Sequence, residues 1–306
     1  MTGHEPGGRD VTSKILVLGE SGQTAMELAR LGPPPGFTLA FAGRARFDLA
    51  GPDDPAALIE AEDPAAVINA AAYTAVDKAE SEQDAAFRLN RDVPAALARA
   101  CAGRGVPFVH FSTDYVFDGT KPEPYVEDDP KAPTSVYGRS KAEGEDAVLA
   151  AGGRAVILRT SWVYSAFGAN FVRTMLRLAA ERAEIGVVAD QLGRPTWARD
   201  CAAGALQAVL ALLDRAPQVE GVLHLSGAGD ATWADFARAI FEQSAARGGP
   251  RAEVRNIATA DYPTPARRPA NSRLDCARIT RVLDLPMRPW RDGLSACLDQ
   301  MQGPKP

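Results

Sequence analysis

Short apolar runs alternate with helix-like segments over the first half of this chain, and this alternation limits the fold more than any other feature. Residues 15–18, Ile-Leu-Val-Leu, form an uninterrupted apolar run, a glycine-containing turn follows, and residues 26–31 have helical character. The same order returns as strand, helix and strand at 37–42, 54–61 and 66–70. Uninterrupted apolar strands are typical of parallel sheets that helices cover on both faces. The sequence therefore predicts an α/β fold with a doubly wound parallel sheet, the Rossmann arrangement.

Composition limits the partners of the chain. With 306 residues, 46% of them hydrophobic, it has enough apolar surface for a packed core. Its formal charge of −5, without a long basic run, argues against nucleic acid as a partner. The four cysteines lie far apart and predict neither disulfides nor a zinc site. No segment has the apolar length of a membrane span or of a signal core, so a cytoplasmic protein without a membrane partner is expected.

The turn after the first apolar run is the expected place of a dinucleotide. Residues 19–25 read Gly-Glu-Ser-Gly-Gln-Thr-Ala, between a predicted strand and a predicted helix. Glycines there let backbone amides approach a pyrophosphate at the N-terminus of the helix. Small side chains at the end of the third predicted strand would also let a cofactor lie close to the backbone. The candidate contacts are Gly19, Ser21, Gly22, Gln23, Thr24, Ala70, Ala71 and Ala72.

The end of the second predicted strand indicates which nicotinamide cofactor binds. An Asp or Glu there would bond the ribose 2′-hydroxyl of NAD, whereas an arginine nearby accommodates the 2′-phosphate of NADP. Gly43 and Arg44 follow this strand and offer no carboxylate. NADPH is therefore the expected cofactor, with NADH as the alternative, and Arg46 competes with Arg44 for the phosphate. Asp48, which precedes Leu49, either contacts the adenine or caps a turn.

Tyr137 and Lys141 lie four residues apart, in the segment Tyr-Gly-Arg-Ser-Lys, and suit the reduction of a carbonyl group. If the segment is helical, both side chains lie on one face. The ammonium would then lower the pKa of the phenol toward the working pH of a general acid. Thr113 ends the preceding predicted strand, at the edge where α/β sheets hold ligands, and is expected to orient the carbonyl. Asp114 either shares the proton delivery, bonds a sugar hydroxyl or caps a turn.

Longer segments resemble the dTDP-4-dehydrorhamnose reductase family, within the extended short-chain dehydrogenase/reductase superfamily. The resemblance spans almost the whole chain from Lys14. The matching segments are Asn-Ala-Ala-Ala-Tyr-Thr-Ala-Val-Asp-Lys-Ala-Glu (69–80), Ser-Thr-Asp-Tyr-Val-Phe-Asp-Gly-Thr (112–120), Val-Tyr-Gly-Arg-Ser-Lys (136–141), Arg-Thr-Ser-Trp-Val-Tyr (159–164) and Arg-Pro-Ala-Asn-Ser-Arg-Leu (268–274).

The resemblance implies roles for individual residues. Thr113, Tyr137 and Lys141 would be the catalytic triad, and Ser112 would line the cofactor. Contacts to a nucleotide sugar would come from Val76, Thr113, Asp114, Trp162, Asn170, Arg268 and Asn271. An indole such as that of Trp162 suits the apolar face of a sugar, and an arginine such as Arg268 suits a diphosphate.

The chain departs from the family in two places. Thr24 and Ala25 stand where Val-Gly is common, which changes close packing rather than chemistry. Some relatives dimerise through a magnesium ion held by acidic residues. Glu27 fits one such position, but Arg199 stands where another carboxylate would be expected, and a cation opposes metal binding. We therefore expect no metal, and a monomer or a weak homodimer.

The expected activity is NADPH-dependent reduction of the C4 ketone of dTDP-4-dehydro-L-rhamnose, with Tyr137 as proton donor. Two alternatives stay open: a nucleotide-sugar epimerase or dehydratase, and a non-catalytic regulatory subunit resembling that of methionine adenosyltransferase.

The predicted domains are interleaved. Residues 1–13 are expected to be a flexible tail. Residues 14–160, with a later segment at about 198–226, would form the Rossmann domain that binds NAD(P). The ranges of about 161–197 and 227–306 would form a smaller C-terminal α/β lobe for the substrate.

Overall fold

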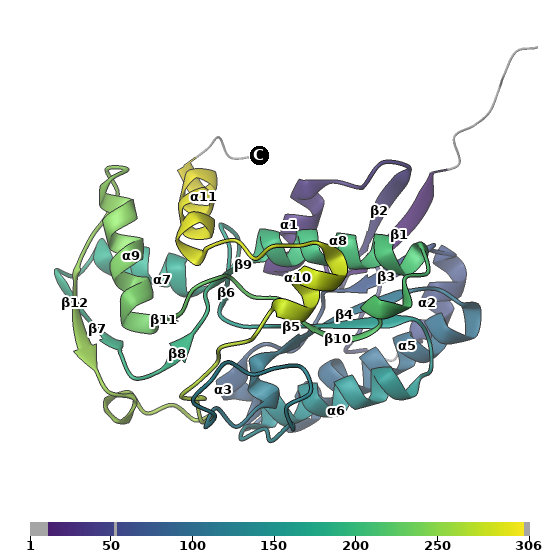
Figure 1. The fold of residues 1–306 in the computed structure, drawn as a ribbon, viewed down its shortest axis with the longest axis horizontal. Coiled ribbons are helices and arrows are strands. Elements are labelled where there is room, and N and C mark those ends of the chain that lie inside the picture. Colours follow the sequence, from purple (N-terminus) through teal and green to yellow (C-terminus); the bar gives the residue numbers. More distant parts are fainter. Residues whose placement is uncertain (1–11, 52–53, 303–306) are drawn as a thin grey trace, which may run out of the picture.

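A six-stranded parallel sheet lies at the centre of the computed structural model, which describes residues 12–51 and 54–302 (Figure 1). Its strand order is β10-β5-β4-β3-β1-β2, and all neighbours are parallel. The strands are β1 (Ser13–Leu18), β2 (Phe37–Ala42), β3 (Ala66–Asn69), β4 (Phe108–Thr113), β5 (Ala155–Thr160) and β10 (Gly221–His224). The doubly wound parallel sheet predicted from the sequence is therefore confirmed.

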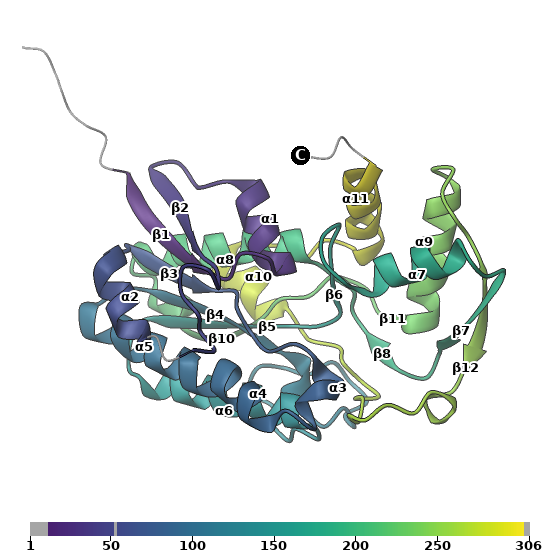
Figure 2. The same cartoon turned by 180° about the vertical axis from the view of Figure 1, so that it is seen from behind.

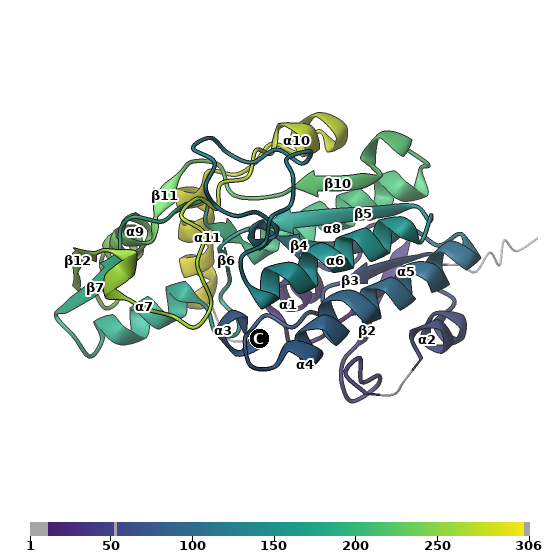
Figure 3. The same ribbon diagram turned by 90° about the horizontal axis from the view of Figure 1, so that it is seen from below.

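Helices cover both faces of the sheet, as Figures 1 and 3 show. One face carries α1 (Gln23–Leu31), α8 (Ala198–Leu213) and α10 (Ala277–Leu283), and the other carries α2 (Pro55–Glu62), α5 (Val93–Arg104) and α6 (Val136–Ala150). Successive side chains of a strand point to opposite faces. Ile15 and Val17 accordingly join the first core, and Leu16 and Leu18 join the second. This double burial explains why the strand is apolar throughout.

The helical region from Gln83 to Arg104 consists of three consecutive segments. These are α4 (Gln83–Phe87), a π-helical turn η1 (Arg88–Asp92) and α5, which carries Pro94 in its first turn. Because proline lacks an N–H group, it suits only the first turn of an α-helix. The short helices α3 (Val76–Ala79), η2 (Asp114–Val116), η3 (Pro217–Val219) and η4 (Thr259–Asp261) complete the connections.

The C-terminal elements surround a separate apolar core, seen from behind in Figure 2. Its helices are α7 (Phe171–Ala179), α9 (Trp233–Ala245) and α11 (Trp290–Gln302). Its strands pair as β7 (Glu184–Val188) with β12 (Glu253–Ile257), β6 (Val163–Tyr164) with β9 (Thr196–Trp197), and β8 (Leu192–Gly193) with β11 (Ala231–Thr232). Among the described residues, no helix combines the length and the apolar character that crossing a bilayer requires.

The predicted domain boundaries need adjustment at two places. Ser13 already belongs to β1, while residues 1–11 of the predicted tail lie outside the described residues. Helix α10 was assigned to the substrate lobe, but its Ile279 packs into the core cluster that contains Ile15 and Val17 of the sheet. Because α10 has only seven residues, its sequence pattern does not indicate which core it joins. Its contacts with α8 and β10 place it against the central sheet.

The strand order also locates the binding crevice. β1 has β2 on one side and β3 on the other, so the chain reverses its direction of winding at β1. In open α/β sheets, ligands bind beyond the carboxyl ends of the strands at such a reversal. We therefore expect the binding site beyond the carboxyl ends of β1 and β3.

Gly144 tests the packing of α6 against the π-helical turn. A Cβ atom at Gly144 would lie 1.9 Å from the Asn90 carbonyl oxygen, so Gly144→Ala should lower the free energy of unfolding by about 1–3 kcal/mol. Gly103→Ala in α5 is the matched control, because a Cβ there meets nothing within 4 Å. It should raise that free energy by about 0.5–1 kcal/mol. Urea denaturation followed by circular dichroism measures both, and equal effects would contradict the packing.

Candidate active site

One cavity of about 850 Å³ opens beyond the carboxyl ends of the central strands. It brings together most of the residues predicted from the sequence. Its walls include all of the predicted catalytic and cofactor residues, namely Gly19, Ser21, Gly22, Gln23, Thr24, Arg44, Asp48, Leu49, Ala70, Ala71, Ala72, Ser112, Thr113, Tyr137 and Lys141. Val76, Asp114 and Trp162 line it as well. Segments far apart in sequence thus form a single site.

The turn between β1 and α1 lets the chain backbone form one wall of this cavity. Gly19 has a φ of 100°, in the region that favours glycine, and a Cβ there would lie 3.3 Å from the Ala71 amide nitrogen. α1 begins at Gln23, and its N-cap residue, Gly22, has no side chain that could cap the helix. The first amide groups of α1 therefore stay available for an anion. This cradle fits the pyrophosphate of a dinucleotide.

The structure distinguishes between the two candidate arginines after β2. The Arg46 guanidinium is paired with Glu62, which also binds Lys14 at 3.0 Å. Arg44 lines the cavity, and no hydrogen bond or ion pair joins it to another described residue. Asp48 lines the cavity too, and its Oδ1 accepts a hydrogen bond from the Ala50 amide at 3.0 Å. Both predicted roles of Asp48, a contact to the adenine and a turn cap, are therefore compatible with its position.

Glu20 also lines the cavity, although it was not among the residues predicted from the sequence. Its carboxylate lies against Gly43, immediately after β2, where a Cβ atom would be 2.1 Å from Glu20 Oε2. In the sequence these two residues are 23 positions apart. The sequence places Glu20 in the glycine turn, but its position beside the end of β2 depends on the pairing of β1 with β2.

Helix α6 presents Tyr137 and Lys141 to the cavity, as the four-residue spacing predicts. The helix begins after Ser135, whose hydroxyl accepts a hydrogen bond from the Gly138 amide at 3.1 Å. Lys141 is only 2% exposed, and its Nζ donates to the Phe111 carbonyl at 2.6 Å. Nζ also lies 3.2 Å from His110 Nε2, a contact that was not predicted from the sequence.

The expected lowering of the Tyr137 pKa is wrong for this structure. Burial of the phenol raises its pKa to about 12, and a hydrogen bond with Thr113 only partly opposes this effect. The Lys141 ammonium is engaged by Phe111 and His110 instead. Burial lowers the pKa of Lys141 itself to about 8, against the charge of Glu145, which raises it. Tyr137 is thus held in its protonated form at neutral pH.

Hydrogen bonds fix the hydroxyl groups at the end of β4. Thr113 Oγ1 donates to Asp114 Oδ1 at 3.0 Å and accepts from the Tyr115 amide at 3.2 Å. Burial raises the pKa of Asp114 to about 6. Ser112 Oγ donates to Glu145 Oε1 at 2.6 Å. The polar groups at this strand end are therefore oriented before any ligand arrives.

Trp162 lines the cavity, and the residues packed around it hold its side chain in position. Its φ is 50°, an uncommon value for a side chain of this size. The indole stacks on Trp233 with ring centroids 3.6 Å apart, and a Cβ at Gly193 would lie 2.2 Å from Trp162 Cε2. Strained backbone of this kind persists only where the surroundings enforce it, and it is common at binding sites.

Three predicted substrate residues do not line the cavity. Asn170 caps α7 and donates to Gln23 Oε1 at 3.1 Å. Arg268 pairs with Asp77 at 2.6 Å, although its Nη1 is buried without a partner among the described residues. Each of these side chains thus has a structural partner that local sequence could not indicate.

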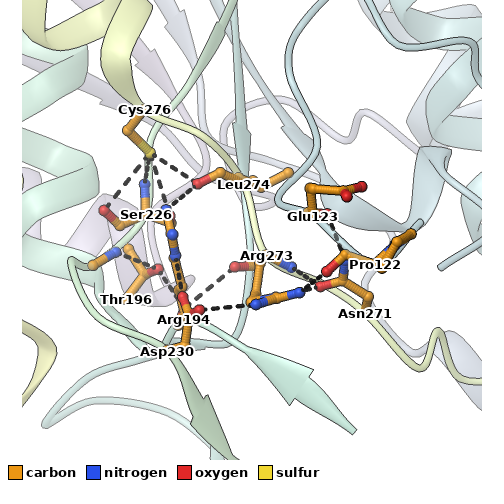
Figure 4. A network of polar contacts seen from close by, with 12 residues as sticks. Pro122, Glu123, Arg194, Thr196, Ser226, Asp230, Asn271, Arg273, Leu274 and Cys276 are labelled. Atoms are coloured by element: carbon orange, nitrogen blue, oxygen red, sulfur yellow. Dashed lines mark hydrogen bonds and ion pairs between the residues drawn. The ribbon is translucent and has the colours of Figure 1, made fainter. Parts of the chain in front are cut away.

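Asn271 belongs to a separate polar network, which Figure 4 shows from close by. Its Nδ2 donates to the carbonyls of Lys121 and Glu123 at 2.6 and 2.8 Å, and its Oδ1 accepts from Arg273. Its amide is fully used by the protein, so the predicted sugar contact is not supported by its position.

Glu27 and Arg199, the two residues at the positions where some relatives bind magnesium, both have other partners in the structure. Glu27 is fully buried, and its Oε1 accepts from Ser165 Oγ at 2.8 Å. Arg199 lies over the Trp197 ring. Across residues 12–51 and 54–302, no three His, Cys, Asp or Glu side chains cluster as metal ligands would.

Comparison with known proteins identifies the family. Residues 13–303 match the family described as RmlD substrate binding domain. A dTDP-4-dehydrorhamnose reductase from Sinorhizobium fredii is 48% identical over 91% of this chain and 94% of its own, and one from Escherichia coli K12 is 40% identical over 94% and 97%. The crystal structure of a dTDP-4-dehydrorhamnose reductase from Bacillus anthracis, in complex with NADP, matches with a TM-score of 0.86, 31% identity and coverage of 95% and 100%. The chain therefore belongs to the dTDP-4-dehydrorhamnose reductase family.

Proposed function

We propose that this protein reduces the C4 ketone of dTDP-4-dehydro-L-rhamnose to dTDP-L-rhamnose with NADPH. The observation that carries the proposal is the shared cavity, in which Thr113, Tyr137 and Lys141 face the glycine turn after β1. Reductase relatives that match along nearly the whole chain support the reaction, and the Bacillus anthracis relative in complex with NADP supports the cofactor.

The residues around the turn fit a dinucleotide. Gly19 lets the backbone approach closely, and the N-terminus of α1 would receive the pyrophosphate. Arg44 would meet the 2′-phosphate, because Arg46 is already paired with Glu62. When bound, NADPH supplies the hydride for the reduction.

Tyr137 would protonate the oxygen of the substrate ketone. Its hydroxyl is protonated at neutral pH and therefore has a proton to donate. Thr113 would orient the carbonyl, with its own hydroxyl held by Asp114. Lys141 would hold the nicotinamide ribose from the same helical face as Tyr137. Val76 and Trp162 would form the walls around the sugar. Structural roles would fall to Asn170, Arg268 and Asn271, which would hold the surrounding segments in place.

A direct assay tests this function. Purified protein is mixed with dTDP-4-dehydro-L-rhamnose and NADPH, and the absorbance of the reduced cofactor is followed. We expect one NADPH to be consumed for each dTDP-L-rhamnose formed. An epimerase or dehydratase would regenerate its cofactor and show no net consumption, and a regulatory subunit would show no turnover. Either outcome would contradict the proposal.

Tyr137→Phe tests the proton donor. The variant should lower kcat by about 10²–10⁴, the usual contribution of general acid catalysis, while NADPH binding changes little. Tyr164→Phe is the matched control, because Tyr164 is a buried tyrosine of the C-terminal core whose hydroxyl donates to the Trp290 carbonyl. Its kcat should equal that of the wild type. Turnover of Tyr137→Phe near the wild-type rate would remove Tyr137 from the mechanism.

The pKa of Lys141 predicts a loss of activity in mild alkali. Its folded pKa is about 8, so the side chain is an ammonium below that pH and a neutral amine above it. Because kcat/KM reports groups of the free enzyme, kcat/KM for NADPH should fall as the pH rises through about 8. The dissociation constant of NADPH should rise in the same window, also in Tyr137→Phe. Binding that is constant from pH 7 to 9.5 would contradict the role of Lys141.

A further inference from the structure

Two oppositely charged side chains lie at the end of the cavity where the adenosine ribose of a dinucleotide is expected. Glu20 comes from the turn after β1, and Arg44 follows β2 by two residues. Both line the cavity, and both are exposed. No hydrogen bond or ion pair joins either of them to another described residue. Arg46, close by in sequence, is by contrast paired with Glu62.

The position of Glu20 corresponds to that of the acidic residue expected at the end of the second strand in NAD-binding folds. In such folds that carboxylate accepts a hydrogen bond from the ribose 2′-hydroxyl. Here the residue after β2 is Gly43, which has no side chain. The Glu20 carboxylate instead lies against its Cα, in space that a Cβ would fill. Glycine at position 43 thus admits a carboxylate from a different strand end.

We propose that Glu20 is a specificity-determining residue that favours NADH, in opposition to Arg44, which favours NADPH. This inference rests on the proposed use of a nicotinamide cofactor. A carboxylate accepts a hydrogen bond from the 2′-hydroxyl of NADH but repels the 2′-phosphate of NADPH. Arg44 has the reverse preference, because a guanidinium pairs with a phosphate. The balance of the two charges sets the ratio of the two affinities.

The opposite preferences of Glu20 and Arg44 affect which of the two cofactors the protein binds. Glu20 weakens NADPH binding without abolishing it, since Arg44 offsets the repulsion. It also provides the ribose contact that a chain with Arg44 alone would lack. The protein should therefore accept both cofactors, with an NADPH preference that is smaller than Arg44 by itself would produce.

The experiment measures cofactor binding to the full-length protein without substrate, by titrating NADPH and NADH against the quenching of tryptophan fluorescence. Glu20→Gln keeps the size of the side chain and removes its charge. It should lower the dissociation constant of NADPH about three- to tenfold, while that of NADH rises. Glu20→Ala should raise the dissociation constant of NADH about tenfold. Arg44→Gln should do the reverse and raise the dissociation constant of NADPH about tenfold.

Glu60→Gln is the matched control, because Glu60 is an exposed glutamate of α2 that does not line the cavity. It should leave both constants unchanged. The gain of Glu20→Gln for NADPH should also shrink in high salt, which screens exposed charges.

The outcomes separate this inference from the proposed function. If the wild type binds both cofactors and the ratio of their constants is the same in Glu20→Gln, Glu20→Ala and the wild type, the inference is overturned while the proposed function stands. If the wild type binds neither cofactor, both are overturned. A shift of the ratio toward NADPH in both Glu20 variants supports the inference.

Discussion

A buried ion pair between α6 and β5 holds the reacting end of this molecule together. Glu145 of α6 and Arg159 of β5 are both almost fully buried and join through two contacts of 2.7 and 2.8 Å. Breaking such a pair typically costs about 3–5 kcal/mol, because it leaves one buried charge uncompensated. Tyr137, Lys141 and Glu145 are spaced by four residues and share one helix face. The pair therefore fixes the rotation of α6 that presents Tyr137 and Lys141 to the cavity.

The same carboxylate connects the helix to the strand that carries Thr113. Ser112 Oγ of β4 and Arg159 Nε of β5 both donate to Glu145 Oε1 of α6, so this one oxygen atom joins the three elements. His110 extends this arrangement along β4, with Lys141 on its Nε2 and Asn69 of β3 3.1 Å from its Nδ1. Buried polar groups need such partners, and a fully bonded network leaves few alternative arrangements. The lysine is thus held by two groups of β4, and one of them, His110, is held in turn by Asn69 of β3.

At the other end of the cavity, backbone rather than side chains forms the wall. Gly19 approaches the backbone of Ala71 closely because it has no side chain, and Gly22, Gln23 and Thr24 at the start of α1 also line the cavity. The charged side chains at this end are Glu20 and Arg44, which follow the adjacent parallel strands β1 and β2, and Asp48. A wall of backbone amides suits an anionic group in the middle of a ligand, and the charged side chains suit a sugar at the end of that ligand.

Local sequence was sufficient for the sheet, the glycine turn and the pairing of Tyr137 with Lys141, because each depends on spacing within one element. Strand residues must be apolar on both faces in a covered sheet, and residues four apart must share a helix face. Local sequence could not place Arg268 beside Asp77 or Asn271 against the carbonyls of Lys121 and Glu123, since those partners are more than a hundred residues away. Nor could it assign the pKa of Tyr137, because the burial that raises this pKa depends on residues distant in the sequence. Only the tertiary structure decides which charges meet, as Arg268 and Asp77 illustrate, because folding brings distant residues within the few ångströms over which charges interact strongly.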